Sequence, residues 1–149
     1  MAATKLGRAA SLYLAALIGA YGGTLLHTLW SLLRPGTPAE AQDLLLLPPV
    51  VLGLGSLALP FVLVGLLVFG LPLLPALRPN AHRPWVGVVA VLWGAAAGKL
   101  LFAAAEVLMM SRDFDPLRLG SPDMGLCYGA SAALAWWWLE RDRARRAAG

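Results

Sequence analysis

Residues 85–110 read WVGVVAVLWGAAAGKLLFAAAEVLMM, and this stretch decides which kind of fold the chain can adopt. At ~1.5 Å per residue, a helix over this stretch is about 39 Å long, more than the ~30 Å needed to cross the hydrocarbon of a bilayer. The stretch therefore predicts a membrane-spanning helix. Lys99 and Glu106 interrupt it, and a cation near the centre of such a helix costs roughly 2.5 to 3.5 kcal/mol on insertion scales. These two residues are the first candidates for function.

The rest of the chain extends this pattern. Of its 149 residues, 59% are hydrophobic and only 13% are charged, whereas about a quarter of a soluble domain is charged. We expect membrane spans at residues 9–33, 44–74, 85–110 and 122–139. The predicted fold is all-α: a single-domain, integral membrane four-helix transmembrane bundle with up-down topology. Because the connections between the first three spans are short, we expect spans that are neighbours in sequence to pack together.

The distribution of lysine and arginine predicts the orientation. Most of them lie at the N-terminus, between the second and third spans, and at the C-terminus: Lys5, Arg8, Arg78, Arg83, Arg141, Arg143, Arg145 and Arg146. By the positive-inside rule, we expect both termini to be cytoplasmic and residues 140–149 to form a basic cytoplasmic tail. The expected location is the cell membrane, as a multi-pass protein of a bacterial inner membrane. The net charge of +4 is thus explained without nucleic acid. The expected partners are the lipid bilayer and either other membrane subunits or a second copy of the chain.

Prolines and polar residues mark the ends and one kink of the predicted helices. Pro48 and Pro49 suit a first helical turn, and Pro60 predicts a kink within the second span. A re-entrant segment over residues 44–49 is the alternative for the start of that span. Ser121 and Pro122 are a typical start for the fourth helix.

Small residues four positions apart predict close helix contacts. Such pairs occur in the first, third and fourth spans: Gly19 and Gly23, Gly94 and Gly98, and Gly125 and Gly129. In lipid, small residues let helix backbones approach closely, which takes the place of hydrophobic burial in driving association. We interpret these faces as contacts within one chain, with a dimer interface as the alternative.

Polar side chains within the spans predict a cluster in the outer leaflet. Its members come from all four spans: Lys99, Glu106, His27, Thr24, Ser56 and Tyr128. We expect Glu106 near His27 or Tyr128, and Lys99 near Thr24 or Ser56. Because Lys99 and Glu106 are two helical turns apart, they are poorly placed to pair with each other. The cluster is interpreted either as an ion or ligand site or as hydrogen bonding that fixes the helix packing.

The residues required by several enzyme classes are absent from the sequence. The only cysteine is Cys127, which excludes an intramolecular disulfide, and the two histidines are too few for a histidine-rich metal site. We expect no metal and no cofactor.

The favoured function is a non-enzymatic accessory, assembly or scaffold subunit of a larger membrane complex. The alternative is a small transporter or channel using Lys99, Glu106 and His27. A membrane enzyme using Asp113, Asp115 and Asp123 is the third hypothesis.

Overall fold

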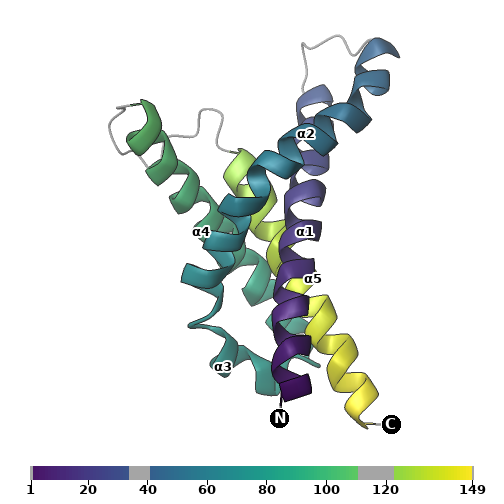
Figure 1. Cartoon of the computed structure of the whole chain (residues 1–149), viewed down its shortest axis with the longest axis vertical. Coiled ribbons are helices and arrows are strands. Elements are labelled where there is room, and N and C mark those ends of the chain that lie inside the picture. The colour runs from purple at the N-terminus through teal and green to yellow at the C-terminus, as the bar shows by residue number, and fades with distance from the viewer. Residues whose placement is uncertain (1, 34–40, 111–122, 149) are drawn as a thin grey trace.

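The computed structural model describes residues 2–33, 41–110 and 123–148, and these form helices and turns without strands. Four long helices dominate (Figure 1). In chain order the elements are α1 (Ala2–Leu32), α2 (Ala41–Gly65), the π-helix η1 (Leu66–Gly70), α3 (Leu74–Leu77), the 3-10 helix η2 (Arg78–Asn80), α4 (Pro84–Met110) and α5 (Asp123–Ala148). The predicted all-helical fold is confirmed. The predicted helix start at Ser121 and Pro122, and the acidic residues Asp113 and Asp115, lie outside the described residues.

Three of the long helices are long and apolar enough to cross a membrane. Within the described residues these candidate spans are Ala9–Leu32, Leu44–Gly70 and Pro84–Leu108. The helix α5 is not among them, because tryptophans and a charged tail lower its hydropathy. The helix α5 packs extensively on both α1 and α4 (Figure 1), so these two helices cover part of its surface.

The helix α2 differs from the sequence prediction at its start and at its end. It begins at Ala41, so Pro48 and Pro49 lie inside the helix and not in its first turn. A membrane tolerates such prolines because neighbouring groups can satisfy the freed backbone atoms. The helix also continues through Pro60, and its regular hydrogen bonding changes at Leu66, where the π-helix η1 begins.

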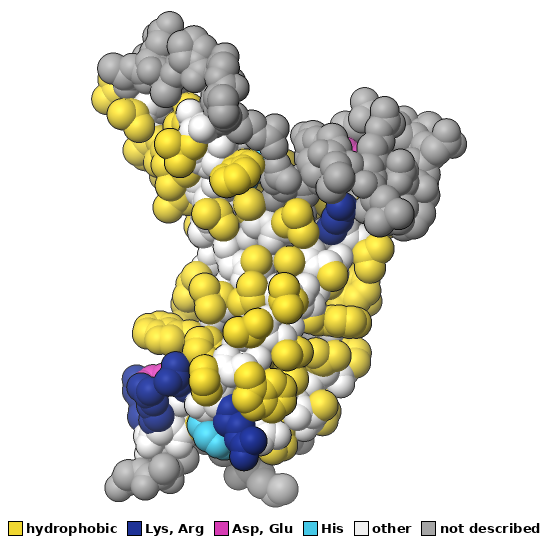
Figure 2. Space-filling view, turned by 180° about the vertical axis from the view of Figure 1, so that it is seen from behind, with side chains coloured by type: hydrophobic (Ala, Val, Ile, Leu, Met, Phe, Trp, Pro, Cys, Tyr) yellow, Lys and Arg dark blue, Asp and Glu magenta, His cyan; other side chains and the backbone are white. Residues whose placement is uncertain are grey.

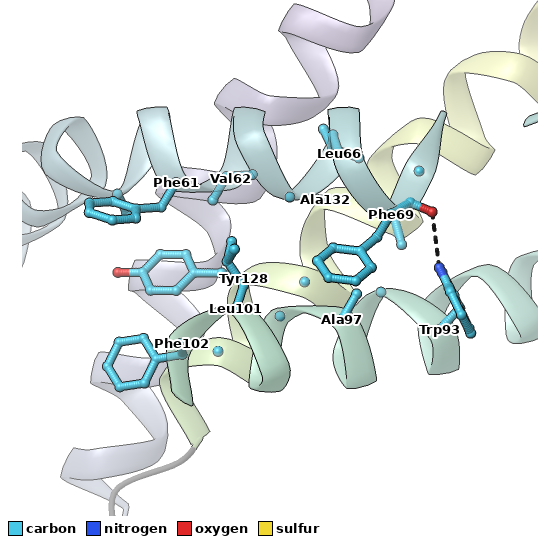
Figure 3. A pocket seen from close by; sticks show the side chains of 18 of the residues that line it. Phe61, Val62, Leu66, Phe69, Trp93, Ala97, Leu101, Phe102, Tyr128 and Ala132 are labelled. Carbon is cyan, nitrogen blue, oxygen red and sulfur yellow. Dashed lines mark hydrogen bonds between the residues drawn. The ribbon is translucent and has the colours of Figure 1, made fainter. Parts of the chain in front are cut away.

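The prediction that sequence neighbours pack together is confirmed for two of the three pairs, α1 with α2 and α4 with α5, but not for α2 with α4. The helices α2 and α4 make few contacts and diverge toward the end of the molecule away from the termini (Figure 1). The physical reason is that α4 has one face of small residues, and α5 occupies it. Phe61 on α2 and Trp93 on α4 lie on the sides of these helices that face the space between them (Figure 3).

The glycines of α4 and α5 form the closest helix contact in the described structure. A Cβ atom on Gly98 would meet the carbonyl oxygen of Gly125, and one on Gly94 would meet the carbonyl oxygen of Gly129. The converse also holds, since a Cβ on Gly125 would lie 2.5 Å from the carbonyl oxygen of Gly98. The two backbones are therefore in direct contact, which only glycine permits.

The glycines of α1 pack against the opposite side of α5. A Cβ on Gly19 would lie 2.5 Å from the Cβ of Ala132, and one on Gly23 would lie 2.5 Å from the ring of Tyr128. Fully buried alanines of α1, such as Ala16 and Ala20, complete this interface. The central position of α5 thus follows from small residues on three helices.

A network of charged side chains joins three segments at the end of the molecule that holds both termini. The Glu140 carboxylate lies 3.4 Å from Arg78 and 3.2 Å from Arg143, and its side chain is only 11% exposed. Arg143 also donates to the backbone carbonyl of Gly7 in α1. Figure 2 shows basic side chains gathered at this end of the displayed face. Glu140 therefore ties the turn after α3 to α5 and, through Arg143, to α1.

The variant Glu140→Gln is expected to lower stability by about 1 kcal/mol, because it removes a largely buried charge between two arginines that are themselves partly exposed. The apparent melting temperature of the purified protein in detergent measures this loss. Asp142→Asn is the matched control: its ion pair with Arg146 is exposed, so we expect a change below about 0.5 kcal/mol. Equal melting temperatures for both variants would contradict the assigned role of Glu140.

Candidate functional site

The divergence of α2 and α4 leaves an apolar cavity of about 380 Å³ between them. Figure 3 shows its walls. One wall comes from α2 and η1 and includes Phe61, Val62, Leu66 and Phe69. The opposite wall comes from α4, and α5 closes the cavity with Tyr128 and Ala132. The α4 wall includes Trp93, Ala97, Leu101 and Phe102.

The cavity follows α4 over most of its length. Its lining residues on that helix run from Ala90 to Glu106, a rise of about 24 Å. The cavity is thus long and follows the axis of α4. Both of its long walls belong to candidate spans, so in a membrane it lies at the depth of the lipid chains.

A hydrogen bond joins the two walls near the end of the cavity that Ala90 lines, opposite the end at Glu106. The indole Nε1 of Trp93 donates to the backbone carbonyl of Phe69 at 3.1 Å (Figure 3). The last carbonyls of a helix have no donor within the helix, and the π-helix ends at Gly70. Trp93 supplies such a donor and fixes the separation of the walls at this level.

Two hydrogen bonds between side chains organise the predicted polar residues. Thr24 is fully buried; its hydroxyl donates to the Ala20 carbonyl at 2.8 Å and lies 2.9 Å from the Tyr128 hydroxyl. The Ser56 hydroxyl donates to the Leu52 carbonyl and pairs with Tyr21 at 3.0 Å. These contacts join α1 to α5 and α1 to α2.

The three ionisable residues of the predicted cluster lie on α1 and α4, and neither Lys99 nor Glu106 is bonded to these two pairs. Glu106 is half-buried and lines the cavity together with Tyr128. Lys99 is half-buried on α4, does not line the cavity, and makes no hydrogen bond or ion pair with described residues, Thr24 and Ser56 included. His27 is half-buried on α1, and its backbone carbonyl accepts from Ser31. Within the described part of the chain, no group of three metal-ligating side chains comes together.

Replacing Thr24 with valine and Tyr128 with phenylalanine is expected to reveal a coupling of about 1 kcal/mol, because both changes remove one shared hydrogen bond within the α1–α5 interface. A double-mutant cycle on unfolding in detergent measures this coupling. The equivalent cycle with Tyr21→Phe and Ser56→Ala is the control, since that pair is exposed. Additive losses at Thr24 and Tyr128 would contradict a shared bond.

The aromatic side chains of the cavity were not predicted from the sequence. One feature of the sequence pointed to Trp93. Trp93 lies nine residues into α4, about 13 Å from its start, although tryptophan prefers the membrane interface. A tryptophan at that depth needs a hydrogen-bond acceptor, and the described structure provides the Phe69 carbonyl.

Comparisons with known proteins do not assign the chain to a family, since no family model, curated protein or solved structure matches it.

Proposed function

We propose that this chain is an integral protein of a bacterial inner membrane, with four spans in an up-down arrangement and cytoplasmic termini. Three helices have the length and apolar character of spans, which supports the proposal. The fourth, α5, is flanked by α1 and α4, so lipid contacts only part of its surface. Basic side chains gather at the end that holds the termini (Figure 2), as expected for a cytoplasmic face.

We further propose that the protein binds one alkyl chain of a lipid or other amphiphile in the cavity, and acts as a non-enzymatic accessory component of the membrane. The observation that carries this proposal is the cavity itself. It is lined almost entirely by apolar side chains and glycine, and the polar exceptions Glu106 and Tyr128 lie toward one end of it. An amphiphile has the same distribution: a long apolar part with one polar end.

The dimensions of the cavity favour an alkyl chain over a partner helix. An α-helix with its side chains is ~10–12 Å wide, which corresponds to a cross-section of about 80 Å² or more. The hydrogen bond from the Trp93 indole to the Phe69 carbonyl joins the two walls at one end of the cavity, which leaves no room for a helix between them at that level. A helix would have to push α2 and α4 apart and break the bond from Trp93 to Phe69, whereas an unbranched chain requires neither change.

The positions of the charged residues favour this function over a transporter or channel. Lys99 and Glu106 make no hydrogen bond or ion pair with described residues, and the cavity wall between Trp93 and Glu106 is apolar. An ion following that wall would lose its hydration without gaining polar contacts. The accessory role has its own test: the protein should co-purify with one membrane partner at fixed stoichiometry, and recovery only as a free monomer would argue against it.

Chain binding is tested by native mass spectrometry of the full-length protein extracted in mild detergent. We expect a population whose mass exceeds that of the polypeptide by one lipid or one added C12 amphiphile. A mass equal to the polypeptide alone, even after incubation with dodecanol in excess, would contradict the proposed function.

A further inference from the structure

The apolar wall of the cavity cannot by itself choose among amphiphiles. Inside a bilayer, an alkyl chain leaves surroundings as apolar as the cavity that it enters, so its transfer gains little hydrophobic free energy. The shape of the cavity can select for an alkyl chain, but most membrane amphiphiles have such a chain. Any preference for one class of amphiphile must therefore come from polar groups that meet its head.

The polar groups available to a head group are few. The hydroxyl of Tyr128 already pairs with Thr24 at 2.9 Å. Glu106 is half-buried, lines the cavity, and makes no hydrogen bond or ion pair with described residues. It lies four residues before the end of α4, about 6 Å along the helix, which is the level of lipid head groups. A carboxylate at this position accepts hydrogen bonds and cannot donate them.

Resting on the proposed function, we propose that the Glu106 carboxylate makes this cavity selective for amphiphiles whose head group carries an ammonium. An ammonium supplies hydrogen-bond donors and a positive charge, which complement the acceptor oxygens and the negative charge of the carboxylate. An anionic head group is repelled by that charge. Lys99 shares a helix face with Glu106 but is seven residues deeper, about 10 Å along the helix, and does not line the cavity. It therefore does not neutralise the carboxylate for a head group at the cavity's end.

The test compares three single-chain probes of equal length: dodecylamine, dodecanol and dodecanoate. Their binding to the full-length protein in nanodiscs at pH 8 is measured by thermal shift against probe concentration. We expect dodecylamine to bind on the order of fivefold more tightly than dodecanol, as for a partly solvated ion pair, with dodecanoate the weakest. Glu106→Gln should bring the three affinities to within about twofold. Glu140→Gln, which removes a carboxylate outside the cavity lining, should keep the order.

The outcomes separate this inference from the proposed function. Equal binding of all three probes to the unmodified protein, or an unchanged order in Glu106→Gln, would overturn ammonium selectivity while leaving chain binding intact. Failure of all three probes to bind would overturn the proposed function itself. Nanodiscs made of phosphatidylethanolamine or of phosphatidylglycerol, with the same acyl chains, show whether the bound ammonium belongs to a bilayer lipid or to a free amphiphile. Retention of the ethanolamine lipid in native mass spectra indicates a bilayer lipid, and retention of dodecylamine alone indicates a free amphiphile; either result supports the ammonium class.

Discussion

Gly98→Leu is expected to disturb the docking of α4 on α5 and to lower the stability of the protein strongly. A Cβ at this position would meet the carbonyl oxygen of Gly125, a backbone atom that cannot move aside without shifting the whole helix. Overpacking a core costs about 1–3 kcal/mol where side chains can yield, and more where backbone must move. We expect a loss of about 4 kcal/mol, which corresponds to a fall in melting temperature on the order of 10 °C. Thermal unfolding in detergent, monitored by circular dichroism, measures it.

The matched control is Gly53→Leu in α2. Gly53 is exposed, and a Cβ there would have no neighbour within 4 Å. Leucine also has the higher helix propensity, so this variant should melt within a few degrees of the unmodified protein. If both variants melted at the same temperature, the close contact between α4 and α5 would not be what holds the helices together.

Ala97→Trp is expected to reduce binding of an alkyl chain at least tenfold. Ala97 is 8% exposed and forms part of the α4 wall opposite Phe69 (Figure 3). An indole there extends into the cavity between Ala97 and Phe69 and occupies the path of the chain. Native mass spectrometry with dodecanol gives the bound fraction, and circular dichroism shows whether the variant remains helical.

The adjacent residue provides the control for this variant. Ala96 is exposed on α4 and does not line the cavity, so Ala96→Trp adds the same indole to the same helix without entering the cavity. It should retain the chain as the unmodified protein does. Loss of the chain from both variants, or from neither, would show that the chain binds elsewhere.

The sequence predicted the helices well because each depends on local composition. The expected span at 85–110 and the helix α4 over Pro84–Met110 agree within a residue at the start, since Pro84 suits a first helical position. The π-helix at Leu66–Gly70 was not predicted. Its apolar residues fit a regular helix equally well, so composition does not distinguish the two, and the structure shows Trp93 of α4 bonded to the Phe69 carbonyl within it.

The candidate site was harder to predict because it depends on the angle between helices. The sequence places Glu106 and Tyr128 in the outer part of their spans, and the structure brings both to one cavity. Their neighbours Phe61 and Phe102 have no feature in the sequence that distinguishes a cavity wall from a lipid-facing surface. That distinction arises only because α5 occupies the small-residue face of α4 and leaves α2 at a distance.

An alkyl chain in the cavity between α2 and α4 is located by photo-crosslinking with a C12 probe that carries a diazirine on its chain. The labelled residues are then mapped by mass spectrometry. We predict labelling of Phe69, Leu101 and other cavity residues that excess dodecanol suppresses, and that Ala97→Trp abolishes. Labelling confined to outward-facing residues such as Leu92 and Leu108, and unaffected by dodecanol, would contradict the account.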